Sequence, residues 1–379
     1  MPAHMPPGRR RYEKTLGQWR ALPHNPSIKA TAKVRRLRHR NAAPEPEART
    51  DVRIGRIVRL LGDHPMMVIS GTKLASEIGA SRSAVWRFVQ QLRGMGVEIA
   101  GHPATGYQLK SVPDLLLPEF VKPLVKGTIF AERVHHYFRI GSTNAEAMSA
   151  AARGEPEGSV FLAEEQTAGR GRGGHSWVSE KSAGIYCSVV LRPEISPADT
   201  LAISLAAGLA VRAAVQEVTS LVADLRWPND VLLAGKKFCG ILIEMNAEPT
   251  RVRYLVLGIG LNVNHGSFPA ALAKQATSLR LETGKTWSRV ELAAALLKSL
   301  HREYRAIVSA RSKALGEVVR HFEEASSSAR GRRVRVEEEG GYEGVTEGLD
   351  ANGFLRVRTT EGMRTVVSGG VREIESLGH

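Results

Sequence analysis

The chain has 379 residues, of which 42% are hydrophobic and 24% are charged, and its formal net charge at pH 7 is +15. This composition is typical of a globular protein with two or three domains. The sequence contains no long uninterrupted apolar stretch and no apolar N-terminal region, which argues against a membrane helix and a secretory signal.

The two cysteines indicate the cellular compartment, and the distribution of charge indicates which part of the chain binds a polyanion. Cys187 and Cys239 are not spaced as metal ligands, which argues against a disulfide framework or a zinc site and favours a cytoplasmic location. The basic excess is uneven, because residues 1–50 carry a net +9, residues 51–112 a net +4 and residues 113–379 a net +2. A polyanionic partner is therefore expected in the first third of the chain.

Residues 1–50 are rich in Pro, Arg and Ala and show no sustained apolar period. We expect this segment to be a disordered basic arm. Two interpretations stay open: an arm that contacts phosphate groups, or a translation start placed too far upstream, with the protein beginning near Val52.

Residues 51–112 have the pattern of a winged helix-turn-helix domain. Helical periodicity and caps predict helices over residues 53–61, 72–78 and 82–93, followed by strands over 97–100 and 107–109. This order of three helices and a β-wing is typical of DNA-binding domains.

The start of the third predicted helix holds the candidate DNA contacts. They are Ser81, Arg82, Ser83 and Arg87. Residues at this end of a recognition helix usually meet base edges in the major groove. The alternative is a domain that only stabilises the rest of the protein.

A linker is expected from Val112–Pro113, followed by alternating strands and helices. The predicted strands are residues 160–163, 184–191, 222–227, 236–245 and 254–263, and the predicted helices are 144–153, 201–218 and 288–309. A final helix pair is expected to end near Ser326–Ser328, a candidate hinge. About five short strands in residues 330–377 predict a small β-barrel. The fold class is therefore α/β (α+β), with domains over residues 51–112, 113–327 and 328–379.

The strongest local motif is the segment from Gln166 to Trp177, which contains four glycines together with Arg170 and Arg172. Glycines let a backbone wrap closely around an anion, and guanidinium groups bind phosphate or carboxylate. The pattern also fits a flexible surface loop or an RNA-binding tract.

Three further motifs accompany this loop. Arg226–Asp230, with sequence Arg-Trp-Pro-Asn-Asp, precedes residues 236–244 and predicts a β-hairpin whose return strand begins with Lys237. Gly141–Asn144 begins a helix, where Ser, Thr and Asn are ordinary caps as well as possible ligand contacts. Gly258–Asn264 alternates glycine with apolar residues, a pattern that also fits a crowded central strand.

In this order and at these separations, the motifs resemble the family of bifunctional biotin–protein ligases and biotin-operon repressors, in the class with an N-terminal winged helix. The resemblance covers residues 53–377. It implies a central domain of the biotin/lipoate-ligase type with a mixed sheet, followed by an SH3-like barrel. The arm over residues 1–50 has no counterpart in the family.

The resemblance also implies roles for individual residues. The positions that match biotin or adenylate contacts are Ser142, Thr143, Asn144, Gln166, Gly169, Arg170, Gly171, Arg172, Trp177, Lys237 and Gly240. Among them, Lys237, Arg172 and Arg170 are the expected catalytic residues. Asn229 and Asp230 are expected near the nucleotide and its magnesium, with no direct metal ligand assigned.

The implied reaction joins biotin and ATP into biotinyl-AMP and then transfers biotin to a lysine. The implied acceptor is the biotin carboxyl carrier domain of acetyl-CoA carboxylase. Biotin, ATP and Mg²⁺ are the expected ligands, with no tightly bound prosthetic group. The family further implies operator DNA as a partner, a homodimer that forms on adenylate binding, and no membrane.

The sequence departs from the family pattern at three positions. Arg226 stands where the family usually has lysine, Gly173 where some relatives have a third arginine, and His175 where a basic residue is common. Three alternatives remain: a lipoate ligase or octanoyltransferase, a ligand-sensing transcription factor without ligase activity, and a ligase with no DNA-binding role.

Overall fold

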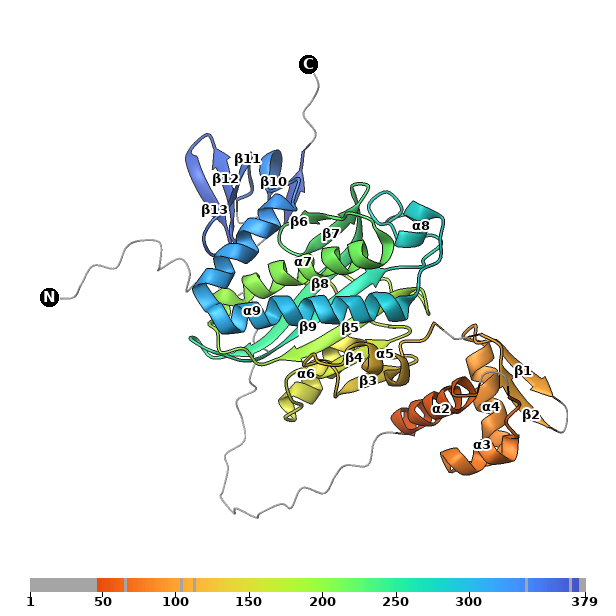
Figure 1. Ribbon diagram of the computed structural model, residues 1–379. Coiled ribbons are helices and arrows are strands. Elements are labelled where there is room, and N and C mark those ends of the chain that lie inside the picture. The colour runs from red at the N-terminus through yellow and green to blue at the C-terminus, as the bar shows by residue number, and fades with distance from the viewer. Residues whose placement is uncertain are drawn as a thin grey trace, which may run out of the picture.

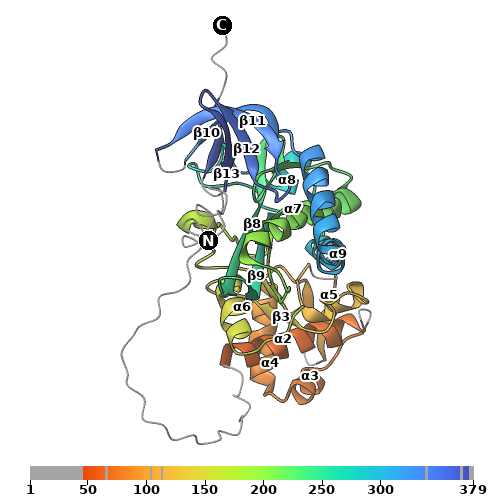
Figure 2. The same cartoon turned by 90° about the vertical axis from the view of Figure 1, so that its left-hand side faces the viewer.

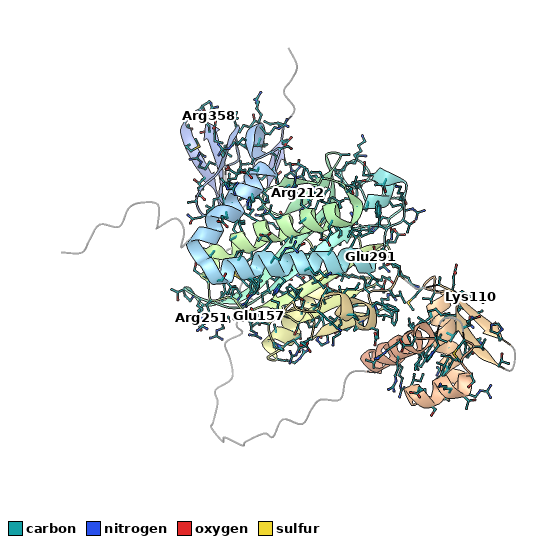
Figure 3. All side chains as sticks on the ribbon, in the orientation of Figure 1. Lys110, Glu157, Arg212, Arg251, Glu291 and Arg358 are labelled. Atoms are coloured by element: carbon teal, nitrogen blue, oxygen red, sulfur yellow. The ribbon has the colours of Figure 1, made fainter. Side chains whose placement is uncertain are left out.

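The computed structural model describes residues 46–64, 67–102, 105–111, 114–337, 340–367 and 370–374 (Figure 1). Of the arm expected over residues 1–50, residues 1–45 lie outside the described residues, as does the linker start at Val112–Pro113. The expectation was wrong for residues 46–50, which form the start of a helix. Charged side chains such as Glu157, Arg251 and Arg358 lie on the outside of the molecule (Figure 3).

The first domain has the predicted order of three helices and a two-stranded wing. Its elements are α2 (Pro46–Gly62), α3 (Gly71–Ile78), α4 (Arg82–Arg93), β1 (Ile99–His102) and β2 (Gly106–Leu109). Helix α2 begins seven residues earlier than expected, at a proline, which is well suited to a first helical turn. Strand β1 begins two residues later than expected, because Val97 packs into the domain core instead of opening the wing.

The centre of the molecule is a seven-stranded mixed sheet of order β3-β4-β5-β9-β8-β7-β6. The strands are β3 (Val134–Tyr137), β4 (Val160–Ala163), β5 (Gly184–Leu191), β6 (Asp224–Arg226), β7 (Asp230–Leu233), β8 (Lys236–Ala247) and β9 (Val252–Asn262). Strands β3 and β4 are parallel, and the other pairs are antiparallel. The sequence did not predict β3.

The two faces of this sheet are covered by different helices (Figures 1 and 2). Helix α6 (Thr143–Ala152) packs on one face against β4, β5 and β9. On the other face α7 (Thr200–Thr219) and α9 (Arg289–Glu324) pack together over the large core. The short helices α5 (Pro118–Leu124) and α8 (Leu279–Thr283) complete the domain.

Helices α7 and α9 bear on two expectations, one about membrane spans and one about a final pair of helices. By length and composition the segment Pro197–Thr219 is apolar enough to cross a membrane, but 67% of its apolar stretch is buried inside the protein. It is therefore the core helix of the central domain. The expected helix pair is instead the single helix α9, which runs without a break through Gly316, where no neighbouring atom crowds the backbone.

The expected hairpin after Arg226 contains one more strand than predicted. The segment 227–229 turns β6 into β7, and a second turn at Ala234 and Gly235 leads into β8. Both residues of that second turn have positive φ, 47° and 75°, as a tight two-residue hairpin turn requires.

The C-terminal part is one antiparallel sheet of the expected five strands. Its order is β13 (Gly362–Val366), β12 (Leu355–Thr359), β11 (Tyr342–Leu349), β10 (Arg330–Val336) and β14 (Val371–Glu373). Within the described residues the pairing is linear, with β13 and β14 at the two edges.

The segment expected to be a hinge is anchored to the central sheet. Ser327 donates to Asp224 from its backbone N–H and from its hydroxyl, at 2.8 and 2.7 Å. Trp227 donates from Nε1 to the carbonyl of Gly353 at 2.9 Å, which ties the turn after β6 to the C-terminal sheet.

Candidate active site

A pocket opens on the face of the sheet that carries α6. Because side chains alternate along a strand, Tyr186 and Ser188 of β5 face the same side as Val190, which packs under α6. Pairing across the ladder then places Gly260 and Gly258 of β9 on this face. Residues of both strands line the pocket.

Three glycines form its floor and admit side chains that a methyl group would exclude. A Cβ on Gly258 would overlap the amide of Asn144. A Cβ on Gly260 or on Gly240 of β8 would lie 2.5 or 2.8 Å from ring atoms of Trp177. The Gly-rich strand β9 is thus explained by close approach of two candidate ligand residues.

The N-terminus of α6 forms a polar wall. Ser142 caps the helix by accepting from the N–H of Ala145, so its ordinary capping role is realised. Thr143 donates from its N–H and hydroxyl to Oε1 of Gln166, at 2.8 and 3.1 Å. Ser188 donates to Oγ1 of Thr143 or Oδ1 of Asn144, at 2.8 and 2.6 Å.

The Gly-Arg-Gly-Arg segment folds into a tight loop beside this wall. The N–H of Gly171 donates to the carbonyl of His175 at 2.7 Å, and Trp177 donates to Gly169 at 2.9 Å. Gly173 has φ +67°, a conformation that favours glycine. A third arginine at that position would be strained, which gives a physical reason for this departure from the family pattern.

Cations converge on one side of the pocket around a single carboxylate. Nζ of Lys237 lies 2.6 Å from Oδ1 of Asp230, and Nη2 of Arg226 lies 2.8 Å from Oδ2. Burial lowers the pKa of Arg172, and the negative charge of Asp230 partly offsets this. The Lys237 ammonium also lies 5.5 Å from the centre of the Trp177 ring, within range of a cation–π contact. This arrangement suits an anionic ligand.

Most of the predicted ligand residues line this pocket together. They are Ser142, Thr143, Asn144, Gln166, Arg170, Gly171, Arg172, Trp177, Asn229, Lys237 and Gly240. Gly169 is not part of the lining, and it packs against the carbonyl of Trp177. Asp230 is not part of the lining either, but it forms an ion pair with the lining residue Lys237. The sequence reasoning missed Tyr186 and Ser188, although a single serine inside an apolar strand was an available signal.

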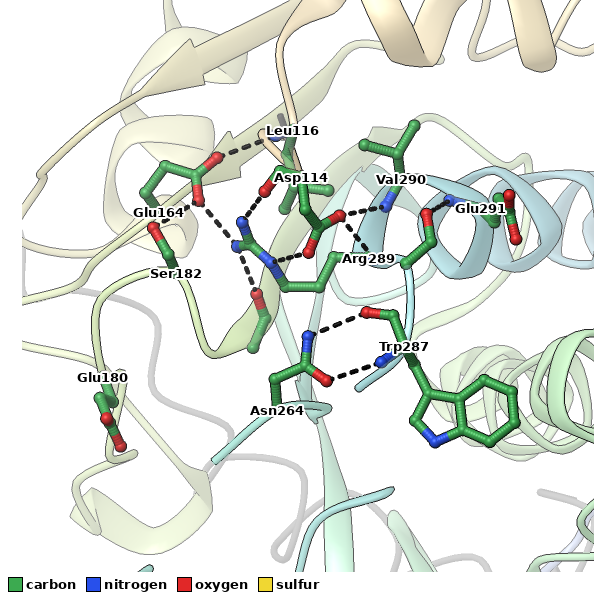
Figure 4. Close-up of polar contacts among 12 residues, drawn as sticks. Asp114, Leu116, Glu164, Glu180, Ser182, Asn264, Trp287, Arg289, Val290 and Glu291 are labelled. Atoms are coloured by element: carbon green, nitrogen blue, oxygen red, sulfur yellow. Dashed lines mark hydrogen bonds and ion pairs between the residues drawn. The ribbon is translucent and has the colours of Figure 1, made fainter. Parts of the chain in front are cut away.

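A buried ionic network surrounds Arg289 at the start of helix α9 (Figure 4). The Arg289 guanidinium donates to Glu164 at 2.7 Å and to Asp114 at 2.9 Å, and the N–H of Leu116 donates to Glu164 at 2.8 Å. Burial would raise the pKa of the Glu164 carboxyl, but the charge of Arg289 and the hydrogen bond from His136 lower it to about 2. Glu164 therefore stays ionised in the protein interior.

The residues predicted to contact DNA are accessible on α4. Ser81 caps the helix through the N–H of Ala84 at 3.2 Å, and its hydroxyl lies 2.9 Å from that of Ser83. Arg82 and Arg87 are exposed, and neither forms a hydrogen bond or ion pair within the described ranges.

Metal ligands are not gathered in the part of the chain that the structure describes. There, no group of three or more His, Cys, Asp and Glu side chains is placed to hold a metal ion. Asp230 is the carboxylate nearest the pocket cations, and two of them already neutralise it.

The fold and the pocket define a class: an α/β enzyme domain that binds an anionic ligand, joined to a helix-turn-helix domain. The profile of the Biotin/lipoate A/B protein ligase family matches residues 139–262, an HTH domain profile matches 53–108, and the Biotin protein ligase C terminal domain matches 330–371. These three matches follow the order of the three parts described above.

Similar proteins extend these matches to most of the chain. The Bifunctional ligase/repressor BirA of Bacillus subtilis is 32% identical over 80% of this chain and 93% of its own length. The Biotin--[acetyl-CoA-carboxylase] ligase of Mycobacterium tuberculosis is 40% identical over 60% of this chain and 83% of its own. The structure of the Aquifex aeolicus biotin protein ligase in complex with biotin and ATP aligns with a TM-score of 0.56 and 29% identity, over 65% of this chain and all of that chain.

The chain belongs to the biotin protein ligase family, among the members with an N-terminal helix-turn-helix domain. The sequence-based prediction of family, fold class and ligase activity is therefore confirmed.

Proposed function

We propose that this chain forms biotinyl-AMP from biotin and ATP and then transfers biotin to a lysine of the biotin carboxyl carrier domain of acetyl-CoA carboxylase. One observation carries the proposal: the pocket joins a polar, glycine-floored cleft to a cluster of cations. A bicyclic ureido ring fits the polar wall of Thr143, Asn144 and Gln166. A carboxylate and a phosphate fit the cations Arg170, Arg172 and Lys237.

In the first step an oxygen of the biotin carboxylate attacks the α-phosphorus of ATP, a P–O bond forms, and pyrophosphate leaves with the electrons of the bond that breaks. The approach of two anions is the main barrier. Lys237 and the two loop arginines lower it by electrostatic stabilisation and by holding the reactants together. Magnesium, when present, supplies further positive charge and arrives with the ATP phosphates, and no step is assigned to it.

In the second step the neutral amine of the acceptor lysine attacks the acyl carbon of the mixed anhydride. AMP leaves, and the amine loses a proton as the amide forms. No covalent enzyme intermediate is needed. Burial raises the pKa of the Cys187 thiol to about 12 and also raises that of Cys239, so both cysteines stay protonated and are poor nucleophiles.

The direct test is incubation of the purified protein with biotin, MgCl₂, α-labelled ATP and a biotin carrier domain, following adenylate and biotinylated carrier separately. Lys237→Ala should slow adenylate formation about 100-fold, with a much smaller loss of biotin binding. Lys236→Ala is the matched control, because this neighbouring lysine is exposed at the same turn. No adenylate from the wild-type protein would favour the ligand-sensing transcription factor without catalysis.

The loop is expected to keep the reactive anhydride away from water and from other lysines. Arg172→Gly should release biotinyl-AMP, so that bystander proteins in the mixture become biotinylated. His175→Ala, an exposed position in the same loop, should keep the selectivity of the wild-type protein. Equal selectivity of both variants would remove Arg172 from this role.

We further propose that the protein acts in the cytoplasm as a biotin-responsive repressor. Adenylate binding would favour a homodimer, and the dimer would bind a two-fold operator through α4. Support comes from the HTH match and from the accessible cations Arg82 and Arg87. Selection from random DNA duplexes, with and without biotin and ATP, tests DNA binding, and sedimentation tests the dimer. A protein that enriches no duplex in either condition is a ligase with no DNA-binding role.

A further inference from the structure

The exposed face of α4 carries a large apolar side chain that the proposed function has not used. Trp86 is 55% exposed, while Trp227 is buried. Helix α4 buries Val85, Val89 and Leu92 along one stripe. At 100° per residue, Trp86 therefore projects about 90° to the side of that stripe, within the exposed face and one turn from both Arg82 and Gln90.

The neighbours of Trp86 define the chemistry of this face. Arg82 and Ser83 lie one turn before Trp86 on the same side of the helix, and Arg87 follows it, 100° further around the exposed face. Helix α4 has three arginines and no acidic residue, and within the described ranges Arg82 and Arg87 have no ion-pair partner. An indole beside unpaired arginines and short polar groups suits an anionic partner that also offers one apolar group to the ring.

Duplex DNA meets this description better than a second copy of the chain. A symmetric contact between two α4 faces would bring Arg82 and Arg87 of both copies together, with no carboxylate on either helix to offset them. Duplex DNA presents phosphates along both edges of the major groove, where arginines bind. Within that groove the C5 methyl of thymine is the apolar group on the base edges.

We propose that Trp86 reads a thymine in the bound DNA by packing its indole ring against the C5 methyl. The proposal rests on the proposed DNA binding and adds a sequence-specific contact to it. The side chain lies in the N-terminal half of α4, the part of a recognition helix that meets base edges. Arg82 and Arg87 would then hold the flanking phosphates and orient the helix.

The experiment begins with duplexes selected by the wild-type protein from a random library, in the presence of biotin and ATP. Each thymine of the selected sequence is replaced in turn by deoxyuridine, which lacks only the methyl group. Affinities are measured by fluorescence anisotropy for the wild-type protein, Trp86→Ala and Trp86→Phe. Val52→Ala is the matched control, because Val52 is an exposed apolar residue on α2 of the same domain.

We expect one thymine at which deoxyuridine weakens wild-type binding about fourfold, the value of one buried methyl group. Trp86→Ala should bind the thymine duplex more weakly and should no longer distinguish thymine from deoxyuridine there. Trp86→Phe should keep the discrimination, since a phenyl ring can still cover a methyl group. Val52→Ala should behave as wild type, and normal biotinyl-AMP formation by every variant shows that the rest of the protein is intact.

Two results would overturn the proposal and leave DNA binding standing. One is equal discrimination between thymine and deoxyuridine in the wild-type protein and Trp86→Ala. The other is a loss of discrimination in Trp86→Phe as large as in Trp86→Ala, which would show that an aromatic ring over the methyl group does not produce the discrimination. A wild-type protein that enriches no duplex refutes the proposed DNA binding itself, and the contact falls with it.

Discussion

Replacing Arg289 by methionine should strongly destabilise the central domain. The guanidinium is fully buried and lies between two carboxylates, at 2.7 Å from Glu164 and 2.9 Å from Asp114 (Figure 4). Methionine keeps most of the length of the side chain and removes the charge. Glu164 is itself fully buried, so the variant would leave its carboxylate in the interior without a cation.

The size of the effect follows from this burial. Removing one partner of a buried ion pair costs about 3–5 kcal/mol, because the remaining charge is not solvated. Helix α9 offers a matched control in Arg320, whose Nη1 lies 2.7 Å from Oε1 of Glu324, with both side chains more than half exposed. Arg320→Met should therefore cost less than about 1 kcal/mol, although the two atoms lie equally close.

Urea denaturation followed by circular dichroism measures both effects. The double variant Glu164→Gln/Arg289→Met should recover part of the loss, because neither charge then remains buried. If Arg289→Met and Arg320→Met lose the same free energy of unfolding, burial does not determine the strength of these pairs. A double variant less stable than Arg289→Met would also contradict the reasoning.

Acid provides a second test of the same network. The pKa of Glu164 is lowered from its ordinary 4.5 to about 2, so its contribution is fully present above pH 4.5 and is lost as the pH falls from 4.5 towards 2. A difference of this size corresponds to about 3 kcal/mol. The stability difference between wild type and Arg289→Met should shrink over that interval. A difference that stays constant down to pH 2 would show that Glu164 is not the group left unpaired.

Two further substitutions test the pocket floor and the contact with the C-terminal sheet. Gly260→Ala should displace the indole of Trp177 and lower adenylate formation at least tenfold, a loss of about 1.4 kcal/mol or more, whereas Gly266→Ala, where no atom lies within 4 Å of the new methyl, should be neutral. Equal activities would show that the indole adapts. Trp227→Phe removes the donor to the Gly353 carbonyl and should cost about 1–3 kcal/mol, with faster proteolysis in the C-terminal sheet. An unchanged cleavage rate would mean that other contacts hold that sheet.

The features predicted best from the sequence are those that neighbouring residues along the chain determine. Apolar spacing located α3 and α4 nearly to the residue, since an amphipathic helix repeats its buried positions every three or four residues. The pocket residues were predicted from the resemblance of the combined motifs to a family, since each motif alone also fitted a flexible loop or an ordinary strand. Arg172 and Lys237 do line one pocket, and their roles stay predictions.

Features that depend on distant contacts were not predictable in this way. Strand β3 contains His135 and His136 and has no apolar run, and it is a strand because it pairs with β4. Strand β7, between β6 and β8, was missed because the turn that follows it needs only two residues, Ala234 and Gly235. The helix after Ser288 was expected to end at Ser309, but packing against α7 extends it to Glu324.

The buried network shows why such contacts matter for the site. Glu164 is joined to Arg289, 125 residues away, and to the N–H of Leu116, 48 residues before it. Two residues further along the same segment, Gln166 accepts from Thr143 in the pocket wall. A shift of this segment by one residue would break both sets of bonds at once, because alternate side chains would exchange sides. The ionic network therefore fixes the register that places Gln166 in the pocket, and local sequence around Gln166 carries no trace of that constraint.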